Sequence, residues 1–215
     1  MIAIYVEPAL TPLSFHDAAG VLRWALGDHN TTPSIEQLSL CLAKSALETG
    51  RWQKIWNFNF GNVKAGGSYV GMYTCIRLNE VLKGKVVWFN PDSDGFAVPP
   101  GHPQTRMRAF ANAWDGADQY VRVMQERFRA AYDAMLTGNA AKYVGALKRT
   151  GYFTADEEPY LRGVQSLQRE FMAKLQGLPH EDVRVADELA ADVERLQKLW
   201  FWQQTGESEE EQTQS

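Results

Sequence analysis

The segment SALETGRWQKIWNFNFGNVK, residues 45–64, combines one acidic side chain with aromatic rings and amides. Glu48 ends an apolar run shortly before Gly50, a pattern that places it in the last turn of a helix. Unpaired carbonyl groups at a helix C-terminus disfavour negative charge, and covering aromatic rings would disfavour it further. We therefore expect Glu48 to favour its protonated form, which could donate a proton to the leaving oxygen of a glycosidic bond. The alternative is a solvent-facing glutamate at a frayed helix end.

Aromatic and amide side chains follow Glu48 closely in the sequence. Flat rings beside amides suit sugars, whose faces are apolar and whose edges carry hydroxyl and acetamido groups. Phe58 and Phe60 are interpreted as core residues, whereas Trp52 and Trp56 stand among polar residues and fit either the core or a sugar site. The other candidates for sugar contact are the rings of Tyr69, Tyr73 and Trp88 and the amides of Asn57, Asn59 and Asn62.

A second carboxylate would be needed for several glycosidase mechanisms. Glu80 lies in RLNEVLKGK, a segment that we expect to fold back across from the helix end. Asp115 is a further candidate, while Asp92 and Asp94 occur in the turn sequence PDSDG and are more typical of turn formation. The histidines are too scattered to predict a metal site, and we expect no cofactor: His16, His29, His102 and His180.

Composition is that of an ordinary globular protein of 215 residues, with 45% hydrophobic and 22% charged residues. A formal net charge of −4 gives no electrostatic reason to expect nucleic acid as a partner, and no apolar run is long enough to span a membrane. The N-terminus lacks the basic region of a signal peptide, which favours synthesis in a reducing compartment. Cys41 and Cys75 are accordingly predicted to be reduced, buried thiols.

Hydrophobic periodicity predicts a mainly helical chain with one small β element. A helix should begin after Ser34, where Ser34 and Gln37 form a capping-box pattern, and end at Gly50. Residues 62–90 predict an antiparallel hairpin or three short strands, and residues 91–105 an irregular loop. Further helices are expected over 17–27, 108–137, 139–149, 156–176 and 181–202, before an acidic, disordered tail at 203–215.

Four segments in order resemble the glucosaminidase domains of glycoside hydrolase family 73, in the lysozyme-like superfamily. They are SALETGRW, NFNFGNVK, MRAFANAWDGADQY at 107–120 and GYFTADEEPY at 151–160. The resemblance covers about residues 33–175 and implies an α+β lysozyme-like fold, mainly helical, with a β-hairpin beside the active-site cleft. We accordingly divide the chain into a helical lead-in (1–32), a catalytic domain (33–177), a C-terminal helix (178–202) and the tail (203–215).

The resemblance also implies roles for individual residues. Glu48 matches the catalytic acid, Glu80 the hairpin carboxylate that serves as base or stabiliser, and Tyr152 the tyrosine that lines the active site. The implied substrate-binding residues are Trp52, Trp56, Asn59, Phe60, Gly61, Tyr73 and Tyr160, of which Asn59, Phe60 and Gly61 floor the cleft. The chain departs from the family at Met107, where phenylalanine is usual, and by inserted residues before Pro159.

The function implied is a peptidoglycan hydrolase that cleaves the β-1,4 bond after N-acetylglucosamine. Glu48 would be the general acid, and the second role could fall to Glu80 as base, to Glu80 as nucleophile, or to the acetamido group of the substrate placed by Tyr152. A muramidase or lytic transglycosylase of the same superfamily is the first alternative. A non-catalytic wall-binding or structural module is the second.

Two expectations concern delivery and assembly. Without a signal peptide, a wall enzyme made in the cytoplasm would reach the wall in a phage particle, through phage lysis or by an injection machine. Residues 183–202 carry an apolar stripe that ends in LWFW at 199–202. This stripe predicts either packing on the domain or docking of a protein partner.

Overall fold

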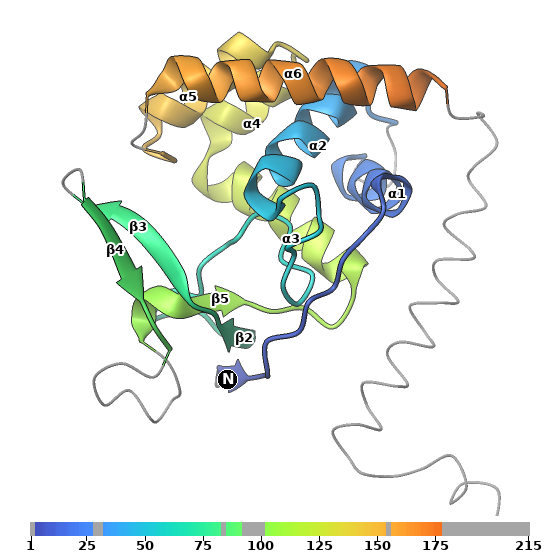
Figure 1. The fold of residues 1–215 in the computed structure, drawn as a ribbon. Helices are drawn as coiled ribbons and strands as arrows, with labels where there is room; N and C mark the ends of the chain where they lie inside the picture. The colour runs from blue at the N-terminus through green and yellow to red at the C-terminus, as the bar shows by residue number, and fades with distance from the viewer. Residues whose placement is uncertain (1–2, 28–31, 83–84, 92–101, 154–155, 178–215) are drawn as a thin grey trace, which may run out of the picture.

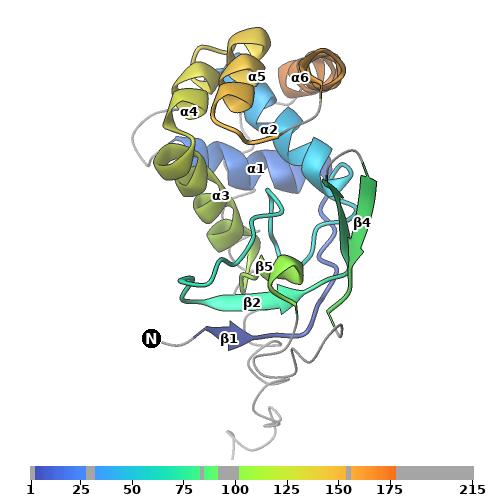
Figure 2. The same cartoon turned by 90° about the vertical axis from the view of Figure 1, so that its left-hand side faces the viewer.

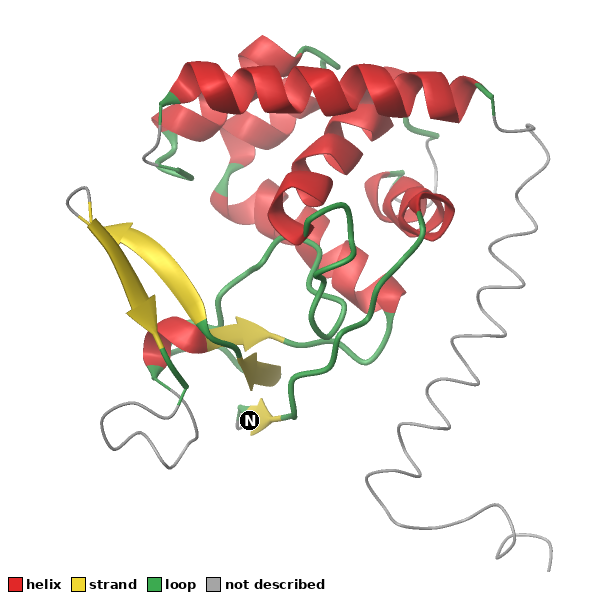
Figure 3. Cartoon of the chain, viewed as in Figure 1, coloured by secondary structure: helices red, strands yellow, loops and turns green. Residues whose placement is uncertain are grey.

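The fold is given by a computed structural model, which describes residues 3–27, 32–82, 85–91, 102–153 and 156–177 (Figures 1 and 3). Its helices are α1 Phe15–Leu26, α2 Ile35–Thr49, α3 Ala113–Arg127, α4 Arg129–Met135, α5 Ala140–Arg149 and α6 Glu157–Gln176. Its strands are β1 Ile4–Tyr5, β2 Met72–Cys75, β3 Leu78–Leu82, β4 Lys85–Phe89 and β5 Arg106–Arg108, with a short 3-10 helix at Pro103–Thr105. The predicted α+β class, mainly helical with small β elements, is confirmed.

Helix α2 is the central helix of the domain. It begins with the predicted capping box, in which the Ser34 hydroxyl accepts from the Gln37 N–H and the Gln37 side chain accepts from the Ser34 N–H. Every residue from Leu38 to Ala46 is buried, because α1 and α6 pack against α2 on different sides (Figure 1). Gly50 ends the helix in the left-handed conformation, as predicted.

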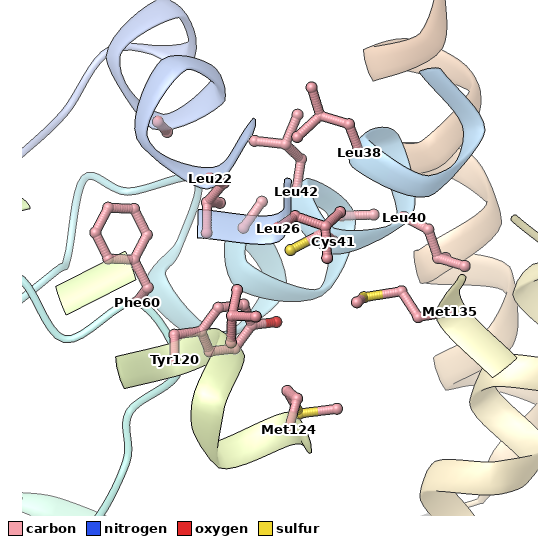
Figure 4. Close-up of a cluster of buried hydrophobic side chains, with 14 of the residues drawn as sticks. Leu22, Leu26, Leu38, Leu40, Cys41, Leu42, Phe60, Tyr120, Met124 and Met135 are labelled. Carbon is pink, nitrogen blue, oxygen red and sulfur yellow. The ribbon is translucent and has the colours of Figure 1, made fainter. Parts of the chain in front are cut away.

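The main hydrophobic core forms around α2. Leucine side chains from α1 and α2 meet Phe60, Tyr120 and Met124 in this core (Figure 4). Cys41 lies among them as a free thiol, and burial raises its pKa to about 12 although Lys44 partly offsets the effect. Cys75 is also buried, and the two cysteines do not form a disulfide with each other, which agrees with the prediction of two buried thiols.

The β structure consists of two separate sheets. β2 pairs in parallel with β1 and antiparallel with β5, while β3 and β4 form an antiparallel hairpin with Glu80 opposite Val87. In Figures 1 and 2 the C-terminal end of α2 points toward this hairpin. The hairpin was expected, but β1 and β5 were not, because short strands paired with distant segments leave little local pattern.

Two features differ from the sequence-based expectation. The helix predicted over 108–137 begins at Ala113 and is interrupted at Phe128, whose φ of −128° is not helical. Residues 106–108 instead form β5.

The predicted helix and docking surface beyond residue 177, and the tail, lie outside the described residues. Among the described residues, every helix is too short or too polar to cross a lipid bilayer.

Candidate active site

Hydrogen bonds from side chains and from the following loop hold the C-terminal end of α2. The Ser45 carbonyl accepts from the Thr49 hydroxyl, and the Ala46 carbonyl accepts from the Arg51 N–H. The Glu48 carbonyl accepts from the Asn62 side chain, and the Thr49 carbonyl accepts from the Lys54 N–H. A helix end held in this way fixes the direction of the side chains it carries.

Glu48 lies one residue before the end of α2 and forms an ion pair with Lys44. The Lys44 Nζ atom is 2.7 Å from Glu48 Oε1, and it also donates to the Tyr152 hydroxyl over 2.7 Å. The Lys44 side chain is 0% exposed, whereas the Glu48 side chain is 24% exposed. The Glu48 side chain therefore contacts a buried cation and is also partly accessible to solvent.

Electrostatics around Lys44 favour its charged form. Burial alone lowers the pKa of Lys44, but the nearby Tyr152 and Glu48, with two further tyrosines, outweigh it and hold that pKa well above its usual value. Burial raises the pKa of Tyr152, and Lys44 partly offsets this. The helix end was expected to disfavour negative charge on Glu48, and the structure adds a buried ammonium group 2.7 Å from its Oε1 atom.

The three asparagines expected as sugar donors serve the backbone instead. Asn57 exchanges hydrogen bonds with the N-terminal segment at Glu7 and Ala9. Asn59 is 2% exposed, accepts from the Val63 N–H and donates to the carbonyls of Val63 and Arg108. Asn62 donates to the backbone carbonyl of Glu48. The three amides therefore position the loop after α2.

Trp52 and Phe60 are also internal. Trp52 is 2% exposed, packs on Phe171 with ring centroids 5.5 Å apart, and donates from Nε1 to the Ser45 hydroxyl. Phe60 is fully buried, and its carbonyl accepts from the same Ser45 hydroxyl. These side chains present no surface for a glycan, which corrects the predicted direct contacts of Trp52, Asn59 and Phe60: they support the loop below Glu48.

Gly61 has a steric role. A Cβ atom at this position would lie 2.6 Å from Cδ2 of the Tyr120 ring, so only glycine allows the two to approach. Tyr73 is 2% exposed and belongs to a separate small cluster with Ala65 and Cys75, which corrects its predicted contact with substrate. Both residues therefore act through packing in this structure.

Trp56, Tyr152 and Tyr160 are only partly buried. Trp56 pairs with Leu10 of the N-terminal segment in an isolated β-bridge. The Tyr152 ring contacts Phe128, and the Tyr160 ring stacks on Phe153 at a centroid distance of 4.3 Å. Glu48 and Tyr152 are thus brought together through Lys44.

Glu80 lies on β3, and its side chain is outside what the structure describes.

Backbone strain is concentrated in the segment after Glu48. Five residues there that are not glycine have positive φ, between 44° and 60°: Arg51, Trp52, Asn57, Phe58 and Asn62. This conformation is costly for such residues and recurs at functional sites, where the surrounding structure enforces it. The strain supports a functional role for this loop.

The fold is shared with solved peptidoglycan hydrolases. A mutant peptidoglycan hydrolase from Sphingomonas sp. A1 matches with a TM-score of 0.50 and 19% identity, over 74% of this chain and 95% of that chain. A C-terminally truncated glycoside hydrolase domain from Salmonella typhimurium FlgJ matches with a TM-score of 0.48 and 22% identity, over 74% and 95%. The match to the Sphingomonas hydrolase confirms, at the level of the fold, the resemblance expected from the sequence.

Two other comparisons gave no match. No protein-family model matches the chain, and no curated protein matches it. The functional assignment therefore depends on the site and the shared fold.

Lys44 and Ser45 are the residues of this site that the sequence reasoning missed, and Asn62, a candidate for sugar contact, instead donates to the Glu48 carbonyl. Lys44 stands four residues before Glu48, the spacing at which opposite charges meet on a helix, so this signal was present in the sequence. Its complete burial was not visible there, because it follows from the packing of α6 and the segment after α5 on α2. The bond from Ser45 to Phe60 depends likewise on the path of the loop.

Proposed function

We propose that the chain is a peptidoglycan hydrolase that cleaves the β-1,4 bond after N-acetylglucosamine, with Glu48 as the general acid. The observation that carries this proposal is the placement of Glu48. Its side chain is partly exposed and lies at the end of the central helix, and Lys44 links its carboxyl group to Tyr152. The shared fold supports the same assignment.

The proposed reaction begins with proton transfer from Glu48 to the glycosidic oxygen. The bond between C1 and that oxygen breaks, its electron pair stays on the oxygen, and the leaving sugar departs as an alcohol. Water then adds to C1 and releases a proton. Either Glu80 on the hairpin assists this step, or the substrate's acetamido group attacks C1 first, with Tyr152 placing it.

The proposed binding surface consists of partly exposed aromatic residues. Trp56, Tyr152 and Tyr160 remain proposed substrate-binding or orienting residues, because each of them is only partly buried. The buried residues of the loop would act on the substrate only through the position of Glu48. The proposed substrate places the activity at the bacterial cell wall.

Product analysis tests this assignment. The full chain is incubated with purified peptidoglycan, and the soluble fragments are identified by mass spectrometry. We expect fragments that end in reducing N-acetylglucosamine. Fragments with 1,6-anhydro-muramic ends would instead show a lytic transglycosylase, and reducing muramic acid ends a muramidase. Binding of the wall without release of fragments would show a non-catalytic module, and each of these results contradicts the proposal.

A further inference from the structure

Lys44 carries a charge within the most buried stretch of the molecule. Its side chain is 0% exposed, and its neighbours in α2 from Leu38 to Ala46 are buried as well. A lysine in such a place is costly unless its charge is paired and its N–H groups are used. The proposed hydrolytic step does not itself require a lysine here. Its presence therefore requires a separate explanation.

The contacts of Lys44 join three parts of the site. Nζ donates to Glu48 one turn further along α2 and to Tyr152 in the segment after α5, each over 2.7 Å. The ammonium group also lies 4.1 Å from the centre of the Tyr152 ring. Tyr160 of α6 is near enough for Lys44 to act on its pKa. Lys44 therefore fixes Glu48 relative to the segment that carries Tyr152.

The charge balance at Lys44 depends on Glu48. The other titratable groups that face it are Cys41 on its own helix, Tyr143 on α5, Tyr152 and Tyr160 on α6, with Tyr120 of α3 next to Tyr143. Burial raises the pKa of each of these thiol and hydroxyl groups, so they are neutral near pH 7. Among the described groups that face Lys44, only Glu48 supplies a compensating negative charge.

We propose that Lys44 is a positioning residue, which holds Glu48 and Tyr152 in one fixed arrangement. This inference rests on the proposed role of Glu48 as the general acid. Lys44 is 0% exposed, so it cannot reach a glycan itself and can act on the reaction only through the two side chains that it binds. Loss of this common donor should therefore lower kcat and leave KM nearly unchanged, because a small misplacement of a reacting group is costly in rate.

The test compares kcat and KM of the full chain and its variants on purified peptidoglycan. Lys44→Met removes the charge and the hydrogen-bond donors, whereas Lys44→Gln keeps donors but removes the charge. Lys142→Gln, a change at an exposed lysine on α5, is the matched control. Circular dichroism selects the folded variants. We expect Lys44→Met to lower kcat by about 10-fold or more, within the roughly 100-fold that a small misplacement can cost, and to leave KM within about twofold of the wild type.

Lys44→Gln should recover part of the loss in kcat, because its amide can still donate to Glu48 or Tyr152. Lys142→Gln should leave both constants unchanged. If folded Lys44→Met keeps the wild-type kcat, or if folded Lys44→Gln recovers none of the loss, the proposal is wrong. Full activity of Glu48→Gln would overturn the proposed function instead, so the two failures are distinguishable.

Discussion

At the scale of single residues, Glu48 and the polar side chains around it differ in burial and in the groups that they bind. The amide of Asn59 is buried and fully used by backbone groups, so it keeps the loop in shape. Glu48 is partly exposed and bonded to a buried cation. Residue type alone did not separate these roles, because burial and bonding partners decide them.

Replacement of Asn59 should destabilise the fold. Asn59→Ala leaves the Val63 N–H and the Arg108 carbonyl without the bonds they now make, while the Val63 carbonyl keeps its bond from the Arg108 N–H. We expect the free energy of unfolding to fall by about 2 kcal/mol or more, since unsatisfied buried groups cost about 1–3 kcal/mol each. Urea unfolding measures the loss. Ser68→Ala, an exposed site in the same connection, should change stability little, and equal losses would contradict the assigned role of Asn59.

At the scale of elements, the site is formed where the loop after α2 packs against α3. Gly116 of α3 touches the backbone of this loop: a Cβ atom there would lie 2.0 Å from the Phe58 carbonyl oxygen. Phe58 itself has a positive φ of 54°. The loop can therefore adopt its strained path only because α3 has no side chain at the point of contact.

Gly116 of α3 and Gly163 of α6 should respond oppositely to replacement by alanine. Gly116→Ala forces backbone atoms apart and should destabilise the protein by about 3 kcal/mol or more, within the range of severe overpacking. A Cβ atom at Gly163 of α6 would contact only the Leu47 side chain, at 3.7 Å. Gly163→Ala should therefore raise the free energy of unfolding by up to about 1 kcal/mol, because alanine favours a helix interior over glycine. Thermal unfolding of both variants measures the contrast. A tolerated Gly116→Ala would show that α3 and the loop are not in this contact.

Sequence patterns predicted the elements whose signals are local. The Ser34 capping box and Gly50 mark both ends of α2, and the ends of α5 and α6 agree with prediction to within one residue. The strands β1 and β5 escaped prediction because their partners are distant in the chain. The burial of Trp52 and of Lys44 escaped it for the same reason: both depend on how α6 and its neighbours pack on α2.

At the scale of the whole molecule, α6 holds the segment after α2 from outside. The Glu170 carboxylate of α6 accepts from Nη1 and Nη2 of Arg51, with N–O distances of 2.7 and 2.8 Å. It also forms an ion pair with Lys174. These hydrogen bonds hold the pKa of Glu170 at about 2, well below its usual value of 4.5. The ion pair therefore connects the last helix to the loop that begins beside Glu48.

The contribution of this ion pair should depend on pH. Because the pKa of Glu170 is lower in the folded state, the stabilisation is present above about pH 4.5 and is lost as pH falls toward 2. Glu170→Gln should lower the free energy of unfolding at pH 7 by less than about 1 kcal/mol, since the groups are partly exposed. The difference from the wild type should shrink in acid. Glu158→Gln, which breaks an exposed pair within α6, is the control, and a pH-independent difference would contradict the assignment.

The central claim is that Glu48 supplies the proton that breaks the glycan strand. Its direct test is the release of reducing ends from purified peptidoglycan by the wild type, by Glu48→Gln and by Glu36→Gln, a change at the exposed first turn of the same helix. We predict that Glu48→Gln stays folded and loses activity by about 100-fold or more, because loss of general acid catalysis typically costs about 10²–10⁴-fold, while Glu36→Gln releases reducing ends like the wild type. Release of reducing ends by Glu48→Gln at the wild-type rate would contradict the claim.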